Sequence, residues 1–299
     1  MMTHTAARRA VKFDAAMVRR QQRRRWALKL ALYGFLVVTG LPIMVGYAWL
    51  FLNSFSEVLV FGLIPERLTL QNWSFLWKPP SPWYPSLWRC FANSMFLALG
   101  MVVAVVGTST PAAYVLSRMK FPGRAAILAG TLILHAFPGI TLLIALFFVL
   151  RFLGLLDSVV GVFLIRAALM MPFAIWVMKG FFDNIPWDVE RAALVDGATR
   201  IQTWYKVMLP QVKQGIGAIS VFAFLAGWAE YIFVITFIRR MDNWTMASYV
   251  NALIGDWRFL DYGLLAAVSL FYLFPVLLFF LFAQRYLLHM AVGGMKGGG

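Results

Sequence analysis

Six long apolar runs constrain this chain more than any other feature of its sequence. A helix needs roughly 20 mostly apolar residues to cross about 30 Å of hydrocarbon, and each run is long enough to do so. The runs are Ala27 to Leu52, Phe91 to Leu116, Ala125 to Leu150, Ser158 to Met178, Ile216 to Ile238 and Tyr262 to Phe282. Because 62% of the 299 residues are hydrophobic and only 13% are charged, we expect an all-α membrane protein with six transmembrane helices.

The positions of the basic residues predict how these helices cross the membrane. Residues 1–26 form a strongly basic tail directly before the first run, which is too long for a signal peptide. With this tail in the cytoplasm, the cytoplasmic loops hold more than twice as many Lys and Arg as the outer ones. We therefore expect three parts with both termini cytoplasmic: the tail 1–26, a six-span domain 27–285 and a C-terminal tail 286–299. The net charge of +15 is concentrated at the ends of the apolar runs, so we interpret it as a signal of membrane topology, with contact to lipid headgroups as an addition, and not as nucleic-acid binding.

The loop between the first two runs, Asn53 to Cys90, is rich in proline and in large rings. Proline stiffens the path of the chain, and Trp prefers the headgroup region, so we expect an ordered external segment at the membrane interface. Interfacial packing alone or contact with an external partner protein would both explain it. The rings are Trp73, Trp77, Trp83, Tyr84 and Trp88.

The sequence offers little support for enzymatic chemistry. Cys90 is the only cysteine, the three histidines are far apart, and no nucleophile, base and acid stand together within the runs. The glycine-rich end of the chain lacks the spacing and the Ser or Thr of a phosphate-binding loop. We expect no catalytic residue, no metal ligand and no cofactor in this chain, and no hydrolysis of a nucleotide by it.

A polar segment, Lys179 to Gly215, separates the fourth and fifth runs and has a helical pattern. Its composition predicts a short helix over about Trp187 to Asp196 and a left-handed turn at Gly197. A second helix follows and is closed by Pro210. Its apolar residues recur at helical spacing: Ile201, Trp204, Tyr205 and Met208. Such a helix pair either lies on the membrane surface or inserts into a cleft of another protein.

This segment resembles the EAA motif of binding-protein-dependent ABC importer permeases of the maltose-type carbohydrate uptake family. In that pattern Glu-Glu-Ala-Ala is followed by Asp-Gly-Ala and, about eleven residues later, by Leu-Pro. The matching residues are Glu190, Arg191, Ala192, Ala193, Asp196, Gly197, Ala198, Leu209 and Pro210. Arg191 departs from the pattern, because the family has a second glutamate there that can pair with the ATPase. We expect Glu190 to take over this ionic contact.

The resemblance extends over most of the chain after the basic tail. It includes Asn93-Ser94, the Phe-Pro-Gly-Arg loop at 121–124, Leu153-Gly154-Leu155, Gln284-Arg285-Tyr286 and the Gly-Met-Lys-Gly run at 294–297. A frequent Trp-Asn-Glu-Phe/Tyr signature is present as Trp228-Ala229-Glu230-Tyr231, with alanine in place of asparagine.

The resemblance implies an ABC type I importer permease fold with a cytoplasmic coupling helix, in a bacterial or archaeal inner membrane. It implies a transport subunit, not an enzyme, that imports a sugar or sugar-like solute by alternating access. The implied partners are two ATPase subunits or a homodimer, which bind ATP and Mg²⁺, a second permease subunit and a periplasmic or extracellular solute-binding protein. Glu190 to Gly197 and Pro210 would then form the ATPase-coupling site.

Glu230 is the sharpest candidate for the transport pathway, because an acid within a span is costly and usually faces a protein interior or a wet cavity. Its neighbours Trp228 and Tyr231 could stack on sugar rings. The alternative is that Glu230 forms an ion pair or hydrogen bond that holds helices together.

A rival interpretation is a self-sufficient secondary transporter or channel. Such a protein would show paired intramembrane charges or inverted repeats, and the sequence displays neither to inspection. A membrane-embedded enzyme is a third possibility, without a recognisable catalytic constellation.

Overall fold

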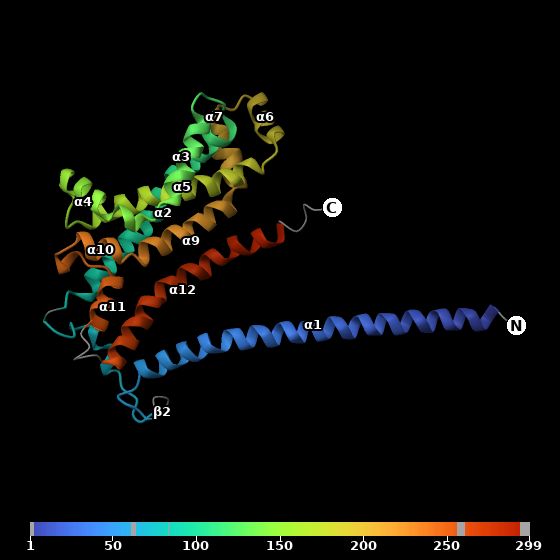
Figure 1. Ribbon diagram of the computed structural model, residues 1–299, viewed down its shortest axis with the longest axis horizontal. Helices are drawn as coiled ribbons and strands as arrows, with labels where there is room; N and C mark the ends of the chain where they lie inside the picture. Colours follow the sequence, from blue (N-terminus) through green and yellow to red (C-terminus); the bar gives the residue numbers. More distant parts are fainter. Residues whose placement is uncertain (1–2, 61–63, 83, 256–260, 294–299) are drawn as a thin grey trace.

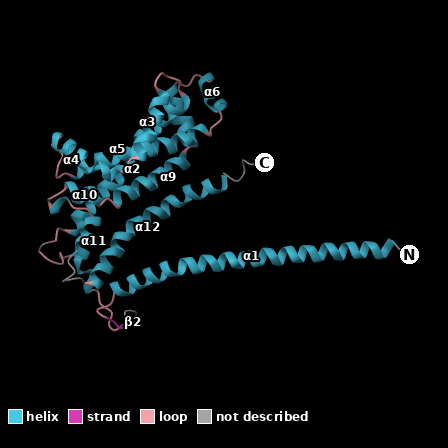
Figure 2. Ribbon diagram, in the orientation of Figure 1, coloured by secondary structure: helices cyan, strands magenta, loops and turns pink. Residues whose placement is uncertain are grey.

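The chain is described by a computed structural model that covers residues 3–60, 64–82, 84–255 and 261–293. It is almost entirely helical, with one small β-hairpin (Figures 1 and 2). In chain order the elements are α1 (Thr3–Ser54), β1 (Leu59–Val60), β2 (Ile64–Pro65), η1 (Gln71–Leu76), α2 (Leu87–Arg118), α3 (Arg124–Ala136), η2 (Gly139–Leu142), α4 (Leu143–Phe152), α5 (Val159–Asp183), α6 (Trp187–Val195), α7 (Arg200–Gln202), η3 (Thr203–Met208), α8 (Leu209–Gln211), α9 (Lys213–Trp228), α10 (Ile232–Phe237), η4 (Met241–Asn243), α11 (Met246–Gly255) and α12 (Tyr262–Gly293).

Among the described residues, four helices are long and apolar enough to cross a membrane by themselves: α1, α2, α5 and α12. They correspond to the first, second, fourth and sixth predicted runs. Two further candidates are bent pairs of helices, so the number of spans is six if each bent pair crosses once. The prediction of an all-α fold with up to six spans is confirmed.

The third predicted run is not one straight helix. It divides into α3 and the η2–α4 segment, which meet at 91°. Proline disfavours the helical conformation of the residue before it, and Phe137, before Pro138, has an extended ψ of 123°. Pro138 and Gly139 therefore mark a break in this span.

The fifth predicted run, Ile216 to Ile238, is also interrupted. Its first part lies in α9, which meets the preceding helical segment Arg200–Gln211 at 77°. The helix then ends at Trp228 and resumes only at Ile232 as the short α10. The prediction of a continuous helix here was wrong. Hydropathy shows only that the segment is apolar, and it does not show that the helix is interrupted at the buried acid Glu230.

The helices α2, α5 and α9 form the centre of the bundle and bury its main hydrophobic cluster. Met101 of α2, Met178 of α5 and Ile219 of α9 are fully buried in this cluster. The helices approach closely where residues are small. At Gly227 an added Cβ would lie 2.6 Å from the backbone oxygen of Leu97 in α2. Small residues therefore set the spacing of α2 and α9, as is common between membrane helices.

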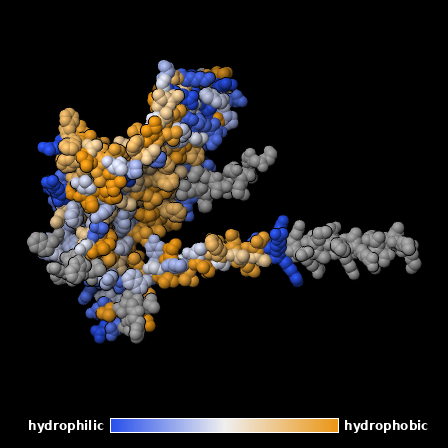
Figure 3. Space-filling model, viewed as in Figure 1, coloured by the Kyte–Doolittle hydropathy of each residue, from blue (hydrophilic) through white to orange (hydrophobic). Residues whose placement is uncertain are grey.

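Helix α1 contributes almost nothing to this core. Its most apolar 18-residue window is 0% buried, and the helix diverges from α12 along its length (Figure 1). Near its C-terminal end, the side-chain amide of Asn53 donates to the carbonyl of Tyr262, 3.1 Å away. Figure 3 shows apolar side chains along the described part of α1. Such a surface requires lipid or another membrane protein around it.

In the segment after α1, the side-chain amide of Asn72 bridges several backbone carbonyls. The Asn72 side-chain nitrogen lies 2.9 to 3.3 Å from the carbonyl oxygens of Asn53, Ser54 and Ser56. Of the predicted interfacial rings, Trp73 stacks on neighbouring aromatic rings, whereas Trp77 and Trp88 are exposed. Trp83 lies outside the described residues.

We expect Gly227→Ala to destabilise the folded chain by about 1 to 3 kcal/mol, because the new methyl group would meet backbone atoms of α2 that cannot rotate away. The thermal unfolding midpoint of the purified protein measures this loss. Gly107→Ala on α2 is the matched control, since nothing lies within 4 Å of its added Cβ. Equal midpoints for the two variants would contradict the close contact.

Candidate functional site

The polar segment between α5 and α9 contains the predicted helix, turn and second helix. Helix α6 extends from Trp187 to Val195, within one residue of the prediction. Gly197 then adopts a left-handed conformation with φ +86°, which favours glycine. The amides of Gly197 and Ala198 donate to the carbonyls of Leu194 and Ala193, which closes the helix as a Schellman motif. The predicted turn at Gly197 is confirmed.

The second helical segment is less regular than predicted. Thr199 and Gln202 form a capping box that starts α7, but residues Thr203–Met208 then adopt a π-helical turn. Pro210 lies in the first turn of α8, where a missing amide is tolerated, and does not end the segment. The helical path continues to Gln211 and bends before α9.

The apolar residues of this segment separate into a buried and an exposed set. Met208 is fully buried, and Trp204 packs against the same cluster. In contrast, Val195 is 86% exposed and Ile201 is 72% exposed, on either side of the Gly197 turn, and Tyr205 is also exposed. We call Val195, Ile201 and Tyr205 the turn patch. Hydrophilic side chains gather around it at the α6 and α7 end of the molecule (Figure 3).

Glu190 points into the protein. Only 2% of it is exposed, and its Oε1 accepts a hydrogen bond of 2.7 Å from the Tyr114 hydroxyl. Its Oε2 lies 3.5 Å from Nε of Arg118. Tyr114 and Arg118 both belong to the end of α2. The expectation that Glu190 presents its carboxylate to an ATPase was therefore wrong, because the carboxylate is already paired within the chain.

The other residues of the predicted coupling site lie on the outer side of α6 and its turn. Arg191 is exposed and lies 3.8 Å from Asp188, one helical turn earlier. Ala192 is exposed, Ala193 is half-buried, and Asp196 and Gly197 are exposed. The small and outward-facing residues of α6 are thus accessible to a partner, whereas Glu190 is not.

Glu230 forms an ion pair inside the predicted fifth span. Its Oε2 lies 2.5 Å from Nε of Arg166 in α5, and its Oε1 accepts a hydrogen bond of 2.9 Å from the Phe233 amide. The hydrogen bond from the Phe233 amide satisfies a donor in the first turn of α10, which begins after the helix is interrupted at this acid. The Arg166 guanidinium also packs over the Phe233 ring. Of the two alternatives for Glu230, the structure shows the ion pair.

Arg166 is a residue that sequence reasoning missed. It lies within the fourth predicted run, where a lone arginine among apolar residues requires a partner, and Glu230 is an acid within another run. The prediction that the runs contain no paired intramembrane charges was therefore wrong. The Arg166 side chain is 27% exposed, so this pair is open on its arginine side.

The two aromatic neighbours of Glu230 differ in their surroundings. Trp228 is fully buried, stacks on Phe224 and Tyr272, and donates its indole N–H to the Tyr272 carbonyl. Its proposed role of stacking on a sugar is contradicted, because no face of the ring is free. Tyr231 is partly exposed, and its hydroxyl lies 2.6 Å from Oδ1 of Asn251 in α11.

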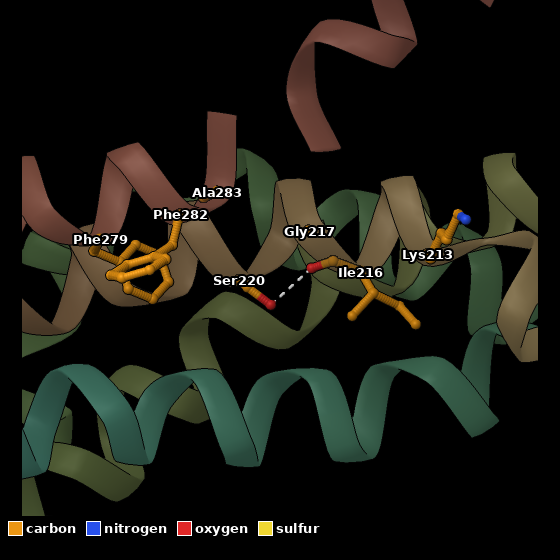
Figure 4. Close-up of a pocket in the computed structure, with 7 residues that line it drawn as sticks. All are labelled: Lys213, Ile216, Gly217, Ser220, Phe279, Phe282 and Ala283. Atoms are coloured by element: carbon orange, nitrogen blue, oxygen red, sulfur yellow. Dashed lines mark hydrogen bonds between the residues drawn. The ribbon is translucent and has the colours of Figure 1, made fainter. Parts of the chain in front are cut away.

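A separate groove of about 350 Å³ lies between α9 and α12. Lys213 and Ile216 line one part of it, and Phe279 and Phe282 line the other (Figure 4). Ser220 uses its hydroxyl to bond the Ile216 carbonyl in its own helix. The groove therefore presents apolar surface with one lysine at its edge, and none of the predicted site residues line it.

Comparison with known proteins places these features in a family. Residues 106–289 match the model described as binding-protein-dependent transport system inner membrane component. The diacetylchitobiose uptake system permease protein NgcG of Streptomyces coelicolor is 30% identical over 85% of this chain and 84% of its own length. The maltose/maltodextrin transport system permease protein MalG of Salmonella typhimurium is 29% identical over 79% of this chain and 84% of its own.

The fold is also found among solved structures. A bacterial ABC transporter involved in the import of the acidic polysaccharide alginate contains a chain with a TM-score of 0.71 and 23% identity. The match covers 85% of the present chain and 96% of that one. At this identity the likeness concerns the fold, which is that of an ABC importer permease.

We expect Arg166→Met to lower the stability of the protein by about 3 kcal/mol, because Glu230 would keep a buried charge without a partner. The double variant Arg166→Met, Glu230→Gln should recover most of this loss, since an amide retains the contact with Phe233. Unfolding midpoints of the detergent-purified protein measure both effects.

Arg89→Met serves as the control for this pair. Arg89 faces Asp242 in an exposed ion pair 3.7 Å long, which is worth under about 1 kcal/mol. A double variant no more stable than Arg166→Met alone would show that the two charges do not stabilise each other.

Proposed function

The chain belongs to the family of binding-protein-dependent transport system inner membrane components, and we propose that the solute it helps to import is a sugar or a sugar-like compound. Membership makes the chain a membrane-spanning permease subunit of an importer, not an enzyme. The names of its relatives support the solute class, because NgcG and MalG belong to uptake systems for diacetylchitobiose and for maltose and maltodextrin.

The proposed complex contains three further kinds of subunit. Two ATPase subunits, or a homodimer, bind ATP and Mg²⁺ on the cytoplasmic side, and a second permease subunit completes the membrane pathway. A periplasmic or extracellular binding protein delivers the solute. The basic tail 1–26 supports a cytoplasmic N-terminus, and an even number of spans then returns the C-terminus to the same side.

The turn patch carries the proposal that this segment docks on the ATPase. Two apolar side chains stand exposed beside a rigid glycine turn at the hydrophilic end of the bundle, a position where exposed apolar groups mark a protein contact. The exposed Ala192 allows close approach. ATP-driven closure of the ATPases would move α6 and thereby rock the spans between inward-open and outward-open states.

Along the membrane pathway we propose Tyr231 as the contact residue, since it alone of the three predicted candidates keeps a partly exposed side chain outside an ion pair or an aromatic core. Its hydroxyl and the Asn251 amide form an exposed polar pair that suits a sugar hydroxyl. The Arg166–Glu230 pair favours the rival class of secondary transporter in one respect, but family membership and the coupling segment favour the ABC importer.

Reconstitution tests this function directly. Proteoliposomes that contain the chain with its cognate ATPase and second permease subunit should accumulate labelled sugar only when ATP and the solute-binding protein are present. Uptake by the chain without an ATPase, driven by an ion gradient, would instead show a secondary transporter.

We expect Gly197→Val to reduce ATP hydrolysis stimulated by the loaded binding protein at least fivefold, because a β-branched residue is strained by about 1 kcal/mol or more at φ +86° and the turn would reshape. Membrane insertion should persist. Gly180→Val in α5 is the control, since nothing lies within 4 Å of its added Cβ and its φ is not positive. Normal stimulation in Gly197→Val would refute a role for the turn.

We expect Ile201→Asp to weaken binding of the ATPase subunits about tenfold or more, because a charge would replace an apolar contact at the turn patch. Affinity of the purified permease for the ATPase in nanodiscs measures this. Ile254→Asp on α11 is the control, as Ile254 is also exposed but α11 lies at the opposite end of the bundle from α7 (Figure 1). Equal losses in both variants would place the ATPase elsewhere.

A further inference from the structure

The end of α2 holds α6 through a buried arginine. Arg118 donates from Nη2 to the carbonyl of Phe182, at 2.6 Å, and to the carbonyl of Ile185, at 2.5 Å. Phe182 belongs to the last turn of α5, and Ile185 lies in the link between α5 and α6. One side chain from α2 therefore satisfies carbonyl groups at the C-terminal end of α5, where a cation also suits the helix dipole.

The same arginine reaches α6 itself. Its Nε lies 3.5 Å from Oε2 of Glu190, and its guanidinium lies 4.6 Å from the centre of the Trp187 ring. Tyr114, one helical turn earlier in α2, donates its hydroxyl to the other Glu190 oxygen. The side chains of Arg118 and Glu190 are 1% and 3% exposed, so water does not compete for these contacts.

We call the contacts of Arg118 and Tyr114 with Glu190 the joint between α2 and α6. A second set of contacts links α2 to α5 beside this joint. The Ser117 hydroxyl donates to Oδ1 of Asp183 at 2.6 Å, and Lys179 pairs with Oδ2 of the same carboxylate at 2.6 Å. The ends of α2 and α5 are thus fixed to each other independently of α6. The polar side-chain contacts that hold α6 against them come from Arg118, Tyr114 and Glu190, and α6 also packs against η3.

The connection from α6 to α9 is built differently. After Gly197 the chain passes through the three-residue α7, the π-helical turn of η3 and a 77° bend before α9 begins. Neither the turn nor the bend contains a charged pair among the described residues 197–212. The direct polar attachment of α6 is therefore to α2, and Arg118 of α2 extends it to the end of α5.

We propose that Arg118 and Tyr114 are positioning residues that join α2, α5 and α6 into one rigid unit, with Glu190 as the attachment point on α6. This rests on the proposed function, in which an ATPase moves α6. When α6 is displaced, the cytoplasmic ends of α2 and α5 then move with it by the same amount. A buried charge pair suits this task, because any rotation of α6 leaves both charges unpaired in a low-dielectric interior.

Two spin labels test the joint in the complete transporter. Asp188 on α6 is highly exposed, and Lys120, two residues after the end of α2, is also exposed, so Asp188→Cys and Lys120→Cys provide the two labelling positions. Cys90 is fully buried and stays unlabelled. We expect one narrow distance distribution between the labels, unchanged between the nucleotide-free and the ATP-bound complex. A shift of this distance on ATP binding would overturn the proposal.

Glu190→Gln provides the loss of function, because it keeps the shape of the side chain and removes its charge. The distribution should broaden at least twofold, and the solute transported per ATP hydrolysed should fall at least fivefold, while the complex still assembles. Tyr114→Phe removes one hydroxyl only and should broaden it less, which keeps the test valid if Glu190→Gln assembles poorly. Asp242→Asn, in an exposed ion pair at η4, is the isosteric control and should alter neither readout.

The joint and the proposed function are contradicted by different outcomes. Narrow distributions and unchanged stoichiometry in both Glu190→Gln and Tyr114→Phe would overturn the joint even if the protein imports sugar with an ATPase. If no ATPase assembles with the chain, the proposed function fails, and the width of the distribution in the purified permease still decides whether Glu190 fixes α6 to α2.

Discussion

The cost of burying a charge organises this molecule. In a bundle that is mostly apolar, Arg118, Glu190 and Glu230 are buried and Arg166 is half-buried, and each charge meets an opposite one from a different segment of the chain. Removal of one partner from such a pair is expensive, so each pair permits a single arrangement of the helices that supply it. Arg118 and Glu190 fix α6 at one end of the bundle, and Arg166 and Glu230 fix the break between α9 and α10.

Packing between the central helices α2, α5 and α9 fixes their positions relative to one another. Apolar side chains alone do not distinguish a neighbouring helix from lipid, since both are equally apolar. Close approach at small residues does distinguish a neighbouring helix from lipid, because it brings the two backbones into contact. Gly227 of α9 meets the backbone of α2 in this way, and Gly100 of α2 lies against the Phe163 ring of α5. The central three helices thus hold their relative positions, and the pairs of charges act on a defined frame.

The sequence predicted much of this fold, and its errors have physical causes. Run lengths identified the spans, and Gly197 identified the turn, because hydropathy and left-handed backbone preference are local properties. The break at Phe137 was detectable from Pro138, but the π-helical turn of η3 carries no such local signal. The directions of the Glu190 and Glu230 carboxylates depend on Arg118 and Arg166, which lie 72 and 64 residues away in the chain. Only the tertiary fold brings them together.

The inward direction of Glu190 changes what a partner can recognise on α6. The charges left on its outer side are Arg191 and Asp188, which lie 3.8 Å apart and are both exposed. A surface pair of this kind is worth under about 1 kcal/mol and is weakened further by salt. In the proposed docking, apolar contacts at Val195 and Ile201 would bury area that no ion screens, so they would supply more of the docking free energy than this pair. Affinity for the proposed ATPase partner would then reside in the turn patch, whereas the charge of Glu190 serves the attachment of α6 to its own subunit.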